Sequence, residues 1–191
     1  MSNSQSPRGS TVTPPLVDAM LKRIHVVESW IAVLAFTIVV GIIMLDVIGR
    51  ELVGPLLRQL GMDPGNTGIF SAQRVAIYAL VVGTYTGIGI ATASGSHIVP
   101  KIGDKMSPDS WGPAINRLAD LTTALFLFGA AGYGWLFVNS ARMLDMRAPI
   151  LDWPLWMIQI FIPLGFVSAA IRYLTFCIWP AAKPQSNELQ D

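Results

Sequence analysis

The residues that most often bind metals or catalyse reactions are scarce in this chain, and they lie far apart. His25 and His97 are the two histidines, and Cys177 is the single cysteine. A zinc site needs several such ligands at short spacing, and a membrane haem needs axial histidines inside the spanning helices. We therefore expect no metal site, no cofactor and no catalytic residues, and we interpret His97 as a polar residue near the membrane surface.

Motifs for nucleotide binding or nucleophilic catalysis are also missing. No segment matches the glycine-rich phosphate-binding loop, and no serine, histidine and acid are placed as a nucleophile with its base. The net charge of +1 argues against a nucleic-acid partner. These absences predict that the chain is not an enzyme. A membrane enzyme or electron-transfer subunit is the weaker alternative.

One acid and one base are spaced so that they can interact directly. Asp46 and Arg50 lie four residues apart, which places them on the same face of a helix. They follow a long apolar segment, so they are expected at the end of a membrane span. The acid could form an ion pair at the membrane boundary or belong to an ion pathway. Its position at the end of the segment favours the ion pair.

Four apolar segments dominate the rest of the sequence. Hydrophobic residues make up 52% of the chain and charged residues only 13%. The four segments contain no Lys, Arg, Asp, Glu or His, and they cover residues 30–45, 75–93, 121–138 and 155–171. Each has about the length that a helix needs to cross a bilayer, and lipid favours helices because the backbone must satisfy its own hydrogen bonds. We predict an all-α integral membrane protein with four transmembrane helices, the first reaching about residue 48.

The segments outside the spans are short. Residues 1–12 are expected to be a disordered tail, residues 13–180 the four-helix membrane domain, and residues 181–191 a C-terminal tail. Residues 13–28 have an amphipathic pattern, which favours a short helix on the membrane surface. The alternative is that they simply extend the first span. A second short amphipathic stretch lies in the loop at residues 49–74.

The second span carries a stripe of small residues. They recur at intervals of four and are Ala79, Gly83, Gly87, Ala91 and Gly95. Helices in lipid associate by close approach at small residues, so we predict that the stripe packs against another helix. That helix could belong to this chain or to a partner subunit.

Charges and tryptophans predict how the chain sits in the membrane. With four spans, both termini lie on one side, and eight Lys and Arg residues belong to that side against five on the other. This excess predicts cytoplasmic termini. The tryptophans expected as anchors at the membrane surfaces are Trp30, Trp153, Trp156 and Trp179.

The absence of charge within the spans also bears on function. A transporter that works alone usually keeps an ionisable or unwound polar site near the bilayer midplane. The spans therefore favour a subunit that supports a larger membrane complex. The alternative is a small autonomous transporter or channel that acts as a homo-oligomer.

The order and spacing of several short motifs resemble a known family. From Ile24 to Leu174 the layout is similar to the small membrane subunit, the DctQ type, of tripartite ATP-independent periplasmic (TRAP) transporters. The matching motifs are Asp46–Arg50, Gly95–Ile98, Pro149 followed by Trp153, and Ile162–Phe166 with Arg172.

The resemblance implies partners and a role. It implies a separate large membrane subunit, a periplasmic substrate-binding protein, surrounding membrane lipids, and a location in the bacterial inner membrane. It implies a scaffold for sodium-driven uptake of organic acids such as carboxylates or sialic acids. The outer loops would then help to dock the binding protein, with Arg58, Arg74, Arg142 and Arg147 as candidates. For each arginine, the alternative is a solvated loop charge.

Overall fold

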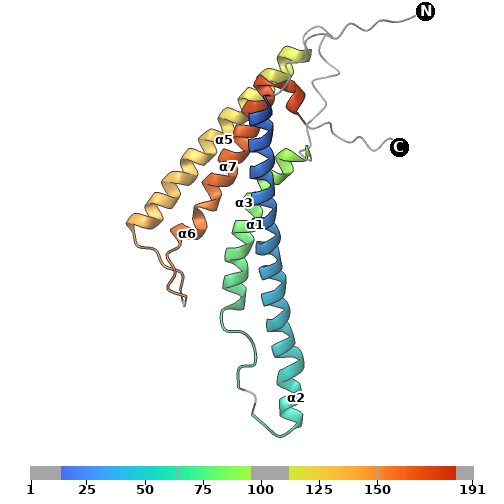
Figure 1. Cartoon of the computed structure of the whole chain (residues 1–191). Coiled ribbons are helices and arrows are strands. Elements are labelled where there is room, and N and C mark those ends of the chain that lie inside the picture. The colour runs from blue at the N-terminus through green and yellow to red at the C-terminus, as the bar shows by residue number, and fades with distance from the viewer. Residues whose placement is uncertain (1–13, 64, 96–111, 150, 184–191) are drawn as a thin grey trace, which may run out of the picture.

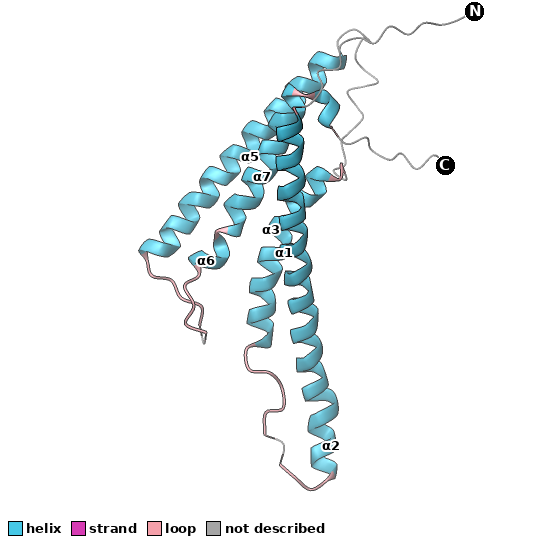
Figure 2. Ribbon diagram, viewed as in Figure 1, coloured by secondary structure: helices cyan, strands magenta, loops and turns pink. Residues whose placement is uncertain are grey.

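The structure, a computed structural model, describes residues 14–63, 65–95, 112–149 and 151–183. All regular elements in these ranges are helical, as Figure 2 shows. Four helices are long and apolar enough to cross a membrane, so the predicted all-α membrane fold is confirmed. His97 and the predicted 1–12 tail lie outside the described residues.

The first helix is much longer than one membrane span. Helix α1 (Pro15–Ile48) continues through a π-helical turn, η1 (Gly49–Val53), into α2 (Gly54–Gln59). Together they form 45 helical residues, or about 67 Å at 1.5 Å per residue. Residues 15–28 therefore extend the first span, which was the alternative to a separate surface helix. No glycine or proline interrupts the chain between Pro15 and Gly41, so nothing ends the helix there.

The four long helices form a row. The other elements are α3 (Ala72–Ala93), α5 (Gly112–Met143), α6 (Trp156–Gln159), α7 (Phe161–Ile178) and the 3-10 turn η2 (Pro180–Ala182). Helix α3 packs between α1 and α7, and α7 packs against α5 (Figure 1). We call the end that holds Pro15 and Lys183 the terminal end. The opposite end, with the loops at residues 60–71 and 144–155, is the loop end.

Glycines bring the central helices together. A Cβ atom on Gly83 of α3 would lie 3.2 Å from the Phe36 ring of α1. On the other side of α3, a Cβ on Gly165 of α7 would collide with the backbone carbonyl of Tyr85, whose ring meets Phe166 edge to face. Glycine is therefore required where α3 meets α7, because any side chain there would push the two backbones apart.

The last membrane segment is interrupted near its loop end. Helix α6 stops at Gln159, and α7 begins at Phe161. Pro163 has no N–H group, so it cannot donate the helical hydrogen bond to the carbonyl of Gln159, four residues earlier. The regular series of backbone hydrogen bonds is therefore interrupted at this point. Gly134 of α5 packs against Pro163, because a Cβ atom built on Gly134 would lie 3.4 Å from Pro163.

The distribution of large apolar side chains fits a lipid environment. The buried apolar residues are mostly alanines, whereas large residues such as Phe126 (77% exposed) and Trp135 (59%) face outward. In water such an outer surface would be strongly unfavourable, but hydrocarbon solvates it.

Candidate functional site

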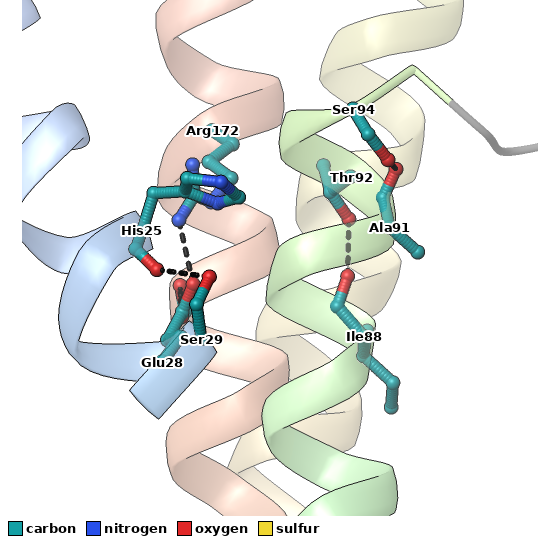
Figure 3. Close-up of polar contacts among 9 residues, drawn as sticks. His25, Glu28, Ser29, Ile88, Ala91, Thr92, Ser94 and Arg172 are labelled. Atoms are coloured by element: carbon teal, nitrogen blue, oxygen red, sulfur yellow. Dashed lines mark hydrogen bonds and ion pairs between the residues drawn. The ribbon is translucent and has the colours of Figure 1, made fainter. Parts of the chain in front are cut away.

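A buried ion pair joins α1 to α7 near the terminal end. Arg172 Nη2 donates a hydrogen bond to Glu28 Oε2 at 2.6 Å, and the Ser168 hydroxyl donates to Glu28 Oε1. Figure 3 shows the Arg172 and Glu28 side chains facing each other from the two helices. The side chains of Glu28 and Arg172 are only 11% and 4% exposed. A charge buried this deeply is stable only if a partner compensates it, and here each group compensates the other.

Helix α3 makes room for this contact through one glycine. A Cβ on Gly89 would lie 2.7 Å from Glu28 Cδ, closer than two non-bonded carbons can approach. Sequence reasoning did not single out Glu28 or Gly89. The available signal was that Glu28 precedes the first span and Arg172 follows the last, so both belong to the terminal end.

Two nitrogens beside the ion pair have no hydrogen-bond partner among the described residues. They are Arg172 Nε and His25 Nδ1, and both are buried. Figure 3 shows the His25 ring next to the Arg172 side chain. The backbone carbonyl of His25 accepts a hydrogen bond from the Ser29 hydroxyl at 2.8 Å. The polar cluster is therefore buried where α1, α3 and α7 meet.

A second buried acid lies at the loop end. Asp46 accepts a hydrogen bond from the Arg50 guanidinium and another from the backbone N–H of Ile69 at 2.9 Å. The structure thus shows the predicted ion pair, and its position at the membrane boundary stays a prediction. Asp46 also fixes the 60–71 loop against α1, and Gly68 leaves space for the carboxylate.

The loop at residues 144–155 is fixed by its own charges. Arg147 donates to Asp145 at 3.3 Å and to Asp152 at 3.0 Å. The hydrogen bond and charge of Asp145, followed by those of Asp152, raise the pKa of Arg147 above its ordinary value. The backbone N–H of Ala148 donates to the carbonyl of Trp153 at 2.7 Å, which closes the loop on itself.

All four arginines proposed for docking lie at the loop end, but they differ in their contacts. Arg147 is held as described above. Arg142 stacks over Trp156, with its guanidinium carbon 5.8 Å from the ring centre. Arg74 Nη1 donates to the carbonyl of Pro149 at 3.4 Å, a long hydrogen bond. Arg58 is exposed and has no side-chain partner in the described part of the chain.

The small-residue stripe does not lie along one contact. Four helical residues turn by about 400°, so each step of the stripe rotates about 40° around the helix. Gly83 is buried against α1, whereas Ala79, Gly87, Ala91 and Gly95 are half-buried. Beyond its chain neighbours and the backbone of its own helix, no described atom lies within 4 Å of a Cβ built on Gly87. Packing of Gly87 against a partner helix stays a prediction.

The predicted tryptophan anchors divide between the two ends. Trp30 and Trp179 lie toward the terminal end, and Trp153 and Trp156 lie at the loop end. Trp30 and Trp153 are 71% and 61% exposed. This placement is compatible with two membrane surfaces, and the anchoring role stays a prediction.

Comparison with known proteins then identifies the family. Residues 39–179 match the family model described as "Tripartite ATP-independent periplasmic transporters, DctQ component". A similar curated protein is the ectoine TRAP transporter small permease protein TeaB of Halomonas elongata. It is 29% identical over 107 residues, which cover 56% of this chain and 55% of that protein. The chain therefore spans about half the length of this relative, and no solved structure matched the chain.

These matches confirm the resemblance read from the motifs. The family match covers the end of α1, all of α3, α5, α6 and α7, and the loops between them. The chain belongs to the DctQ family of small membrane subunits of TRAP transporters.

Proposed function

We propose that this small permease subunit braces a separate large membrane subunit that carries the substrate. One observation carries the proposal: the three buried acids of the described chain are paired with basic residues, and these pairs lie toward the two ends of the row. Glu28 with Arg172 and Asp120 with Lys183 lie toward the terminal end, and Asp46 with Arg50 lies at the loop end. Apolar and small residues fill the region between them, which suits a rigid support better than a route for a polar solute.

Two reconstitutions test the brace against an autonomous transporter. Purified chain alone in vesicles should transport nothing, whereas the chain with the large subunit and the binding protein should take up solute. Solute flux by the chain alone would refute the brace and support the homo-oligomeric transporter or channel.

The substrate and the driving ion are proposed from the family. We infer uptake of an organic acid, such as a carboxylate or a sialic acid, driven by a sodium gradient. The relative TeaB is named for ectoine, so ectoine is the second solute to test. Uptake by the complete transporter should stop when sodium is replaced by choline. Uptake that is unchanged without sodium would reject this coupling ion.

Docking of the periplasmic binding protein is proposed at the loop end, which would face the periplasm if the termini are cytoplasmic. Arg58 gives the sharpest test because its charge is not used within the described chain. Arg58→Glu should lower uptake while the membrane complex still forms. Arg23→Glu, an equal charge change on an exposed residue near the terminal end, is the control. Equal uptake by the two variants would exclude Arg58 from docking.

The face of α3 around Gly87 is proposed as a contact with the large subunit. The space around Gly87 within the chain would accept a closely packed neighbouring helix. Gly87→Leu should fill that space and reduce co-purification of the large subunit. The isolated variant should still fold, because a Cβ at this position meets no described atom beyond its chain neighbours and the backbone of its own helix. Normal complex yield would place the partner elsewhere.

A further inference from the structure

A pocket of about 290 Å³ opens at the loop end, between the end of α1 and the start of α3. Its lining includes Asp46 and Arg50 of α1, Ile69 and Phe70 of the loop, and Arg74 of α3. None of the roles assigned above accounts for this space.

The charges of the pocket leave one positive charge without a counterion. Arg50 and Arg74 each contribute one positive charge, and Asp46 contributes one negative charge. The Asp46 carboxylate already binds Arg50 and the Ile69 N–H. Among the described residues, Arg74 binds only a neutral carbonyl, that of Pro149 at 3.4 Å. A group with a single negative charge would therefore neutralise the pocket.

The length of α3 places the pocket at the level of lipid headgroups. Its 22 residues span about 33 Å, close to the roughly 30 Å thickness of the hydrocarbon core. Ala72, the first residue of α3, then lies at the boundary between hydrocarbon and headgroups. Large apolar side chains surround this end of the helix, with Phe70 72% exposed and Ile77 56% exposed. A soluble anion would gain nothing from these side chains, but acyl chains would.

We propose that this pocket binds the phosphate of a phospholipid headgroup. The phosphodiester carries one negative charge, which matches the net charge of Asp46, Arg50 and Arg74. Guanidinium groups are suited to this role because they can donate two parallel hydrogen bonds to phosphate oxygens. The acyl chains would run into the bilayer beside Phe70 and Ile77. An acidic side chain of a docked protein would use the same charges but not these apolar neighbours.

Native mass spectrometry of the full-length chain in mild detergent tests the proposal. The probes are phosphatidylglycerol, diacylglycerol, which lacks the phosphate, and inorganic phosphate. Wild-type protein should bind phosphatidylglycerol well above the other two. Arg74→Gln should weaken binding of phosphatidylglycerol roughly tenfold, as expected for loss of one charge-assisted hydrogen bond. Arg142→Gln removes one cation from the same end outside the pocket and should leave binding unchanged.

A variant with the opposite expected effect separates the site from general loss of structure. Asp46→Asn removes the negative charge, while its amide oxygen can still accept the Ile69 N–H, so phosphatidylglycerol should bind more tightly. Three results would overturn the proposal. They are equal binding by wild type and Arg74→Gln, equal binding of diacylglycerol, and binding of inorganic phosphate as strong as that of the lipid. If Arg74→Gln still binds the lipid but no longer docks the periplasmic binding protein, the pocket would instead be assigned to that protein.

Discussion

The buried ion pair between Glu28 and Arg172 should stabilise the fold through compensation of two charges, and this can be tested by removing them singly and together. Arg172→Met leaves the Glu28 carboxylate with only the Ser168 hydroxyl as a partner. Glu28→Gln leaves the Arg172 guanidinium, which is almost inaccessible to solvent, without its counterion. The double variant removes both charges and should be less affected than either single variant.

The expected size follows from the burial of both groups. Each side chain is far less than one third exposed, so solvent screens the interaction little. Removing one partner of a buried pair destabilises by about 3–5 kcal/mol, because it leaves an isolated charge. A loss of about 3 kcal/mol lowers the folding equilibrium constant roughly a hundredfold. Because the double variant is expected to lose less than either single variant, the coupling energy between the two positions should be at least about 3 kcal/mol.

The assay is unfolding of the purified chain in mixed micelles, followed by circular dichroism as the fraction of denaturing detergent rises. The four members of the double-mutant cycle are wild type, Glu28→Gln, Arg172→Met and the double variant. Gly89→Ala provides an independent approach, because its methyl group would lie 2.7 Å from Glu28 Cδ and displace the carboxylate. It should destabilise the chain in the wild-type background and much less in a Glu28→Ala background, which removes the atoms that the methyl group would meet.

Two results would refute this reasoning. One is an Arg172→Met variant as stable as wild type, which would mean that water or lipid headgroups compensate Glu28. The other is a double variant whose loss equals the sum of the two single losses, which would mean that the groups act independently.

Three further predictions concern other contacts. In detergent unfolding, Gly165→Ala should destabilise the chain by about 1–3 kcal/mol, since its methyl group overpacks the contact with α3. Gly132→Ala is the control: its methyl group would enter open space, so the variant should be neutral or slightly stabilised. The pKa of Arg147 is raised in the folded loop, so the stabilisation of the loop by charged Arg147 is fully present below the ordinary pKa and is lost only as pH rises through the higher folded value. Tryptophan fluorescence should therefore show no loop transition linked to Arg147 between about pH 6 and about pH 10. Lys183→Ala should cost only about 1 kcal/mol in the same unfolding assay, because Lys183 is 39% exposed and solvent screens its pair with Asp120; a loss as large as that of Arg172→Met would contradict this ranking.

The sequence predicted those features that depend on local composition and spacing. The spans could be located because uninterrupted apolar segments of sufficient length have few other stable locations. The Asp46–Arg50 pair could be predicted because its spacing lies within one helical turn.

Features that depend on the relative placement of distant helices could not be predicted. Glu28 and Arg172 are 144 residues apart, and no local pattern links them. Gly89 is not part of the four-residue stripe, and only the position of α1 explains why it must be glycine. The length of the first helix was also missed, because an amphipathic segment fits either a membrane surface or the exposed end of a longer helix.

The unbroken helical run from Pro15 to Gln59 has a mechanical consequence. A stiff rod about 67 Å long reaches well past a bilayer whose hydrocarbon core is roughly 30 Å thick. A tilt of only about 5° would shift one tip by roughly 6 Å relative to the other. A support of this length keeps its two ends in place only if its tilt is held, and the packing of α1 against α3 contributes to that. The π-helical turn at Gly49–Val53 is the point where the rod is least regular.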